Sequence, residues 1–270
     1  MHRSRPALKL SRGPLALVLA QVRISPVLQM QTFIPQIQER LRNAAYPRYS
    51  EARLQEILFG PGAPASSGPT MTKWTFTDKE ATKAVVIAPD FVTFEATTYE
   101  SFDAFSKELR SLLGLLGEIT EVALAERVGL RFVNHIRSTG DDRIEEYVAP
   151  GLSGIDFGQI GAERTGSVFV DQGTTAGGQY TVRFSRSSGP FTLPADLLPA
   201  DVRIDALDEG GEYAVLDVDH FSTRTREYNP DVLGDVFWEL HDVSEGIFRE
   251  AVTPHALQVW GAREVREEVR

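Results

Sequence analysis

The stretch SFDAFSKELRSLLGLLG at residues 101–117, followed by RVGLRFVNHIR at residues 127–137, decides the fold. In the first part, apolar residues recur every three or four positions, which forms one wide stripe along a helix. In the second part, apolar and polar residues alternate, which is typical of a β-strand. Because a helix with one apolar stripe must cover an apolar sheet face, this pair predicts an α+β protein.

Further elements are predicted on both sides of this pair by the same two periodicities. On the N-terminal side, the predicted strands are residues 15–24, 49–59, 73–77, 82–88 and 91–97. On the C-terminal side, they are residues 165–171, 179–186 and 212–221. Two more helices are expected, one around residues 30–41 and one over residues 230–252, with Asn229 as its N-cap. The short strands and turns favour a mostly antiparallel sheet.

Two segments rich in Gly and Pro divide the chain. Residues 60–69 (GPGAPASSGP) are predicted to be a long loop, and residues 138–160 combine acidic residues with Gly and Pro as at a domain boundary. We therefore predict two α+β lobes, each a mostly antiparallel sheet packed by one or two long helices. Their expected limits are 13–140 and 155–260, with tails at 1–12 and 261–270.

Composition excludes several classes of function. The 38 acidic residues against 28 Lys and Arg give a formal charge of −10, which argues against general nucleic-acid binding. The absence of cysteine excludes disulfides, thiolate metal sites and a Cys nucleophile. The apolar run at residues 15–20 is too short for a secretory signal, and no stretch approaches the roughly 20 apolar residues of a membrane span. We expect a cytoplasmic protein that does not associate with a membrane.

One candidate binding site is a basic row on the strand at residues 127–137. If the apolar residues of this strand face the core, four basic side chains share the opposite face: Arg127, Arg131, His135 and Arg137. Guanidinium groups in a row suit phosphates or carboxylates, so the row predicts recognition of an anion or an acidic partner. The alternative is a structural role in which acidic neighbours such as Glu95 neutralise the row. On the binding hypothesis, Arg131→Ala keeps the fold and weakens binding.

A second candidate site is acidic. Asp217 and Asp219 point to one face of their strand and could share a hard cation, with His241 from the following helix as a third ligand. The other interpretation is a pair of solvated carboxylates. The segment GTTAGG at 173–178 lacks a phosphate-loop ending, and GLSGI at 151–155 lacks the context of a serine nucleophile. We therefore predict no catalytic residue and no cofactor.

Three blocks of sequence carry a resemblance to a known family. They are PLALVLAQVRISPVLQM…IPQIQERLR from residue 14, RVGLRFVNHI from residue 127, and LDVDHF…LHDVSEGIFREAVTP from residue 216. These blocks resemble a sporadically distributed, functionally uncharacterised family of bacterial proteins of about this length. The resemblance implies an intracellular bacterial protein of accessory or defence-linked genes, and it brings no catalytic residue.

These observations favour a non-catalytic binding or regulatory protein that recognises another protein or an anionic ligand. A protein partner or self-association is expected for such a role, and a purely structural oligomer subunit stays open. The alternative from another class is a metal-dependent hydrolase or nuclease that uses Asp217 and Asp219.

Overall fold

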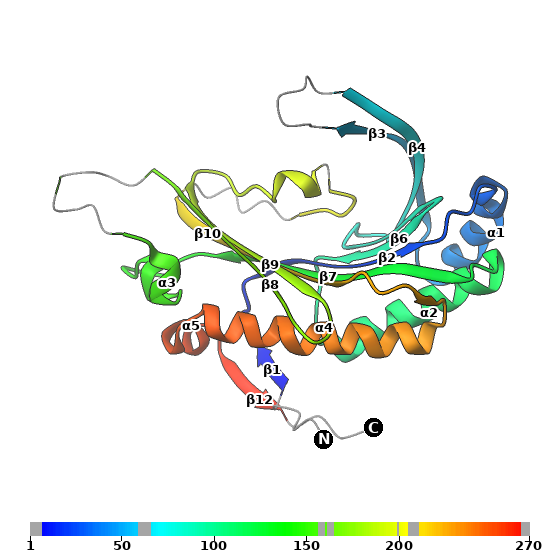
Figure 1. The fold of residues 1–270 in the computed structure, drawn as a ribbon. Coiled ribbons are helices and arrows are strands. Elements are labelled where there is room, and N and C mark those ends of the chain that lie inside the picture. Colours follow the sequence, from blue (N-terminus) through cyan, green and yellow to red (C-terminus); the bar gives the residue numbers. More distant parts are fainter. Residues whose placement is uncertain are drawn as a thin grey trace.

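The structure, a computed structural model, describes residues 7–58, 66–155, 160, 165–198, 200–204 and 211–265. Its centre is one large antiparallel sheet (Figure 1). The strands are β2 (Leu15–Ile24), β3 (Arg48–Leu58), β4 (Ser66–Thr77), β5 (Lys83–Ala88), β6 (Phe91–Ala96), β7 (Leu124–Ile136), β8 (Ser167–Thr174), β9 (Gln179–Ser188), β10 (Glu212–Ser222) and β11 (Arg226–Glu227). Their order is β3-β4-β5-β6-β2-β7-β10-β9-β8, and the short β11 also pairs with β7. The predicted α+β class and the mostly antiparallel pairing are confirmed.

The long helices cover one face of this sheet, two of them below it in Figure 1 and the first one beyond its right-hand end. They are α1 (Met30–Asn43), α2 (Phe102–Thr120) and α4 (Pro230–Ala251). The predicted apolar stripe of α2 is buried, and so are Leu233, Phe237 and Leu240 of α4, whereas Ile247 and Phe248 near the end of α4 are only partly buried. The buried stripe residues pack against the even-numbered apolar residues of β2 and β7, in the core that holds Val18 and Leu130. We call this side of the sheet the helix face.

The opposite face is covered in its middle by a segment without a long helix. Residues 189–204, of which 189–198 and 200–204 are described, carry the 3₁₀ turn η3 (Ala195–Leu197) and lie over the sheet. We call them the cover segment. Its Leu193 and Val202 pack on odd-numbered strand residues, among them Leu19 and Val133. The centre of the sheet is therefore buried on both faces.

The structure corrects the expectation of two separate sheets. β7 and β10, from opposite sides of the predicted boundary, pair from Val128↔Ser222 to Ile136↔Ala214. The physical reason is that both strands carry their apolar residues at even positions. Pairing them therefore lets α2 and α4 share one core instead of closing two small ones.

The predicted boundary and tails also contain ordered structure. Residues 138–155 include η1 (Ile144–Glu146) and α3 (Pro150–Ser153), and Tyr147 is fully buried there. At the ends of the described chain, β1 (Ala7–Leu10) pairs with β12 (Ala262–Val265), which follows α5 (Pro254–Val259).

Of the predicted loop at 60–69, residues 60–65 lie outside the described residues, and 66–69 belong to β4. β4 continues through them because it pairs with β3 as far as Leu58↔Ser66. Among the described residues, no helix is long and apolar enough to cross a membrane.

Candidate functional site

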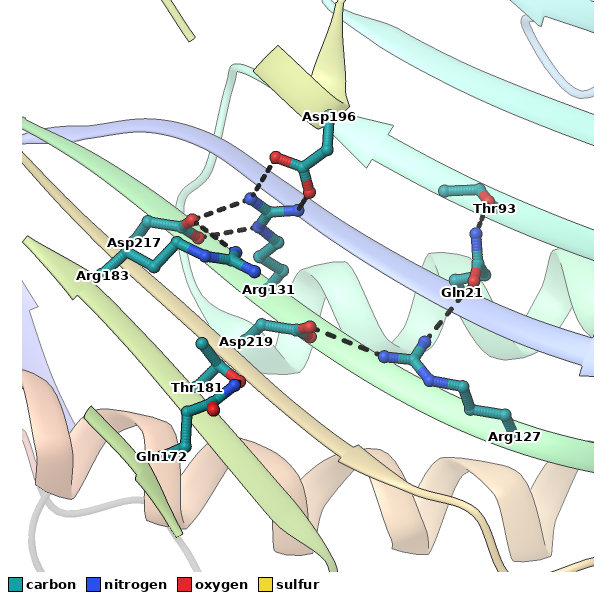
Figure 2. A network of polar contacts seen from close by, with 10 residues as sticks. All are labelled: Gln21, Thr93, Arg127, Arg131, Gln172, Thr181, Arg183, Asp196, Asp217 and Asp219. Carbon is teal, nitrogen blue, oxygen red and sulfur yellow. Dashed lines mark hydrogen bonds and ion pairs between the residues drawn. The ribbon is translucent and has the colours of Figure 1, made fainter. Parts of the chain in front are cut away.

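Beside the cover segment, the sheet carries a cluster of polar and charged side chains that we call the polar face (Figure 2). Its members are Gln21, Thr93, Arg127, Arg131, Gln172, Thr181, Arg183, Asp196, Asp217 and Asp219. The cluster forms because odd-numbered residues of β6, β2, β7, β10 and β9, which are neighbours in the sheet, point to the same side, where Gln172 of β8 and Asp196 of the cover segment join them. In register, Asp219 lies opposite Arg131 of β7, and Asp217 lies opposite Arg183 of β9. Two sites predicted separately from the sequence, the basic row and the acidic pair, are thus brought together.

Arg131 is the centre of this network, and its side chain is nearly saturated. Its Nε and Nη2 donate to the two carboxylate oxygens of Asp217, both at 2.7 Å. Nη1 and Nη2 also donate to Asp196 of the cover segment, at 2.6 and 3.2 Å. Arg131 is 6% exposed and Asp217 is 1% exposed. Four of the five guanidinium N–H groups are therefore used inside the protein, which favours the structural alternative for this residue.

The pKa shifts of Arg131 and Asp196 agree with the contacts of these side chains. Burial lowers the pKa of Arg131, but the hydrogen bonds that Arg131 donates to Asp217 and Asp196 outweigh burial and raise the pKa above its ordinary value. The same contact with Arg131 lowers the pKa of Asp196. The Arg131–Asp196 ion pair is therefore charged at neutral pH, and Asp196 attaches the cover segment to the sheet.

Arg127 and Arg183 are held more loosely. Arg183 donates to Asp217 at 3.3 Å, and its side chain remains 42% exposed. Arg127 lies 3.5 Å from Asp219 and places its guanidinium 4.3 Å from the centre of the Phe221 ring. Burial raises the pKa of Asp219, and burial lowers the pKa of Arg127. These two arginines are the accessible cations of the polar face.

The remaining members of the predicted basic row lie elsewhere. His135 is buried against the cover segment, where its ring stacks on Phe191 at 4.1 Å and meets Tyr213 edge-on. Burial lowers the pKa of His135 to about 4, so the ring is neutral at pH 7. Arg137 is half-buried one residue beyond the end of β7.

In the structural alternative, acidic neighbours neutralise the basic row, and for Arg131 these neighbours are Asp217 and Asp196 and not Glu95. Glu95 lies on β6, two strands from β7, and its pKa is raised to about 7 by burial and then by Asp201. Asp201 also accepts hydrogen bonds from Lys73 at 2.7 Å and from Thr75 at 3.0 Å. These contacts form a second attachment of the cover segment to the sheet.

The three predicted metal ligands do not come together. Asp217 is engaged by Arg131 and Arg183, whereas His241 lies on α4 under the helix face and stacks on Phe102 at 4.0 Å. The sheet therefore separates His241 from both aspartates. In the part of the chain that the structure describes, no three His, Asp or Glu side chains gather as a metal site would require.

Sequence reasoning missed two charged members of the polar face, Arg183 and Asp196. Arg183 has the polar parity of its strand, since Val182 and Phe184 are buried on either side, so alternation alone marks its face. Asp196 lies in a segment without periodicity, and no pattern indicates that it contacts Arg131.

Comparison of the chain with family models, with curated proteins and with solved structures finds no match. The resemblance to a bacterial family stays a prediction.

Proposed function

We propose that this chain is a non-catalytic binding protein whose polar face recognises a carboxylate or phosphate group of a partner protein or small ligand. The observation that carries the proposal is the state of Arg183. Its side chain is 42% exposed, and among the described residues Asp217 is its one hydrogen-bond partner, at 3.3 Å. Asp217 already binds Arg131 at 2.7 Å, so most donors of Arg183 remain available to an incoming anion.

Arg127 supplies a second cation on the same face. Its nearest carboxylate, Asp219, is 3.5 Å away, and Gln21 is the acceptor of its long hydrogen bond at 3.5 Å. Because burial raises the pKa of Asp219, acidification protonates Asp219 before an ordinary aspartate. Protonation releases Arg127 from its counter-charge, so anion binding is expected to strengthen as the pH falls toward the pKa of Asp219.

The alternative function, a metal-dependent hydrolase or nuclease, has less support. Both oxygens of Asp217 accept hydrogen bonds from guanidinium groups, so binding a cation there would require breaking a buried ion pair. Asp219 would then be the one accessible carboxylate of the predicted set. An intracellular bacterial setting, as the sequence resemblance implies, is part of the proposal and accommodates either function.

Calorimetric titration with inorganic phosphate, citrate and a penta-glutamate peptide tests the proposal. We expect one or more of these probes to bind, with affinity that falls as salt rises. Arg183→Ala should weaken binding about tenfold or more, because a charge-assisted contact is worth about 1.5–3 kcal/mol. Arg53→Ala, which removes an exposed arginine on β3, is the matched control and should bind like the parent protein.

Two results would overturn the proposal. The first is no binding of any of the three probes at low salt. The second is equal affinity of Arg183→Ala and Arg53→Ala. Stoichiometric retention of Mg²⁺ or Mn²⁺ that Asp219→Asn abolishes would support the metal-dependent alternative instead.

A further inference from the structure

The free edge of β8 presents an apolar surface to solvent. β8 is the last strand of the sheet, and among the described residues no strand pairs with its outer edge. Three consecutive apolar residues are exposed there: Val168 by 76%, Phe169 by 41% and Val170 by 52%. An exposed strand edge offers unpaired N–H and C=O groups, and apolar side chains beside them favour pairing with another strand.

The opposite edge of the sheet, β3, is built differently. In its described half, the exposed side chains include Arg48, Glu51 and Arg53. Charged residues on an edge strand are a common protection against edge-to-edge association. On β8 the exposed charged residue is Asp171, which follows Val168, Phe169 and Val170, and these three carry no charge, so a longer part of this edge is open to strand addition.

We propose that the β8 edge pairs with the β8 edge of a second copy of this chain, in antiparallel register with a two-fold axis at Phe169. The sequence around this residue is locally symmetric, because Val168 and Val170 flank Phe169. The axis places Val168 opposite Val170 of the partner subunit, and Phe169 opposite its own copy. Side chains directly opposite each other share one face of a sheet, so the pairing keeps both helix faces on the same side.

The surroundings of Phe169 suit this aromatic pair. Phe169 lies opposite Phe184 in the β8–β9 register, on the helix face. It also lines a cavity of about 570 Å³ between the β8–β9 hairpin, α3 and α4, together with Leu152, Tyr180 and Ile247. The phenyl ring of the second copy would thus lie beside an apolar cavity instead of solvent.

Charge sets how the association should respond to salt. Each chain carries a formal charge of −10, so two copies repel one another, and salt screens this repulsion. The dimer is therefore expected to strengthen as salt rises. Anion binding at the polar face should respond in the opposite way, so the two proposals can fail independently.

Sedimentation equilibrium of the parent protein and two variants tests the interface. The parent is expected to be dimeric at micromolar concentration. Val168→Lys, which buries a charge opposite Val170 of the partner subunit, should be monomeric. Val232→Lys is the matched control, because Val232 is an exposed valine (47%) in the first turn of α4, away from the edge. Native-like far-UV circular dichroism and a cooperative thermal transition would show that both variants fold, and the monomeric variant is expected to melt at the lower temperature because it lacks the stabilisation by association.

The absence of cysteine allows a direct test of register. In Phe169→Cys, the two sulfurs would lie opposite each other with Cα atoms about 4.5–5.5 Å apart, which permits a disulfide. Mild oxidation should then give a covalent dimer, whereas Leu28→Cys, at a 94% exposed site, should not. A monomeric parent, or a dimer that Val168→Lys leaves intact, would overturn the interface. Cross-linking by Val170→Cys and not by Phe169→Cys would overturn the register.

Discussion

The two faces of the sheet are stabilised in different ways. The helix face is covered by α1, α2 and α4, which bury a continuous set of apolar side chains. The other face is covered by the cover segment, which has a smaller apolar cluster and is attached by the ion pairs Arg131–Asp196 and Lys73–Asp201. Apolar burial is non-directional and spread over many residues, whereas an ion pair depends on two partners. We therefore expect single substitutions to have graded effects on the helix face, and on the other face large effects where a buried ion pair is broken and small effects elsewhere.

Arg131→Ala should give the largest loss of stability. It leaves Asp217, 1% exposed, as a buried carboxylate without its bidentate partner, which typically costs about 3–5 kcal/mol. The earlier expectation that this variant keeps its fold intact is thereby replaced. The free energy of unfolding in urea measures the effect. The double variant Arg131→Met with Asp217→Leu should recover part of it, because both charges leave together. An unchanged unfolding midpoint for Arg131→Ala would show that the network is not structural.

Leu240→Ala should give the next largest loss of folding stability, about 2–5 kcal/mol, because it leaves a cavity in the core of the helix face. Leu240 is fully buried, and its contacts lie on the side of the sheet away from Arg183. Anion affinity should therefore stay constant at temperatures where the variant is folded. Urea unfolding and phosphate titration of the same sample check both statements. Weakened binding without loss of stability would mean that the two faces are coupled.

The alternation of apolar and polar residues along the strands predicts one part of this fold and not another. Alternation assigns each residue of β7 and β10 to a face, and both assignments agree with the structure. It does not identify which strand lies alongside. Pairing of β7 with β10 joins residues that are between 78 (Ile136 and Ala214) and 94 (Val128 and Ser222) positions apart, across a Gly- and Pro-rich segment, so local patterns predicted a boundary where the sheet is continuous.

Because alternation does not show which strands are neighbours, the sequence also did not predict that the candidate sites form one network. The basic row and the acidic pair were each visible, but they were interpreted as separate binding sites because their mutual distance is a tertiary property. Once β7 and β10 pair, Arg131 meets Asp217 and the two interpretations become one network. His241 was placed correctly on a helix, yet the helix covers the other face.

Glu95→Gln should show an effect that depends on pH. The pKa of Glu95 is raised from 4.5 to about 7 in the folded protein, so between these values the folded state binds more protons than the unfolded state. Folding stability therefore falls as the pH rises from 4.5 to 7 and then levels off. Glu95→Gln has no carboxyl group at this position, so its folding stability does not fall over this pH range. Relative to the parent, it should gain about 1–3 kcal/mol between pH 5 and pH 8, measured by urea unfolding at both values. A difference that does not vary with pH would contradict the raised pKa.

Arg183→Ala should have the smallest effect on stability and sharpens the contrast within the polar face itself. Arg183 and Arg131 both donate to Asp217, but Arg183 does so at 3.3 Å with a side chain that is 42% exposed. Solvent screens such a contact, and exposed ion pairs are typically worth about 0–1 kcal/mol. Asp217 keeps its two shorter bonds to Arg131 when Arg183 is removed, so no buried charge is left unpaired. Unfolding of Arg183→Ala and Arg131→Ala in the same urea series should therefore differ by several kcal/mol. Equal losses would mean that Asp217 needs both arginines, and Arg183 would then belong to the structural core of the network, not to its binding surface.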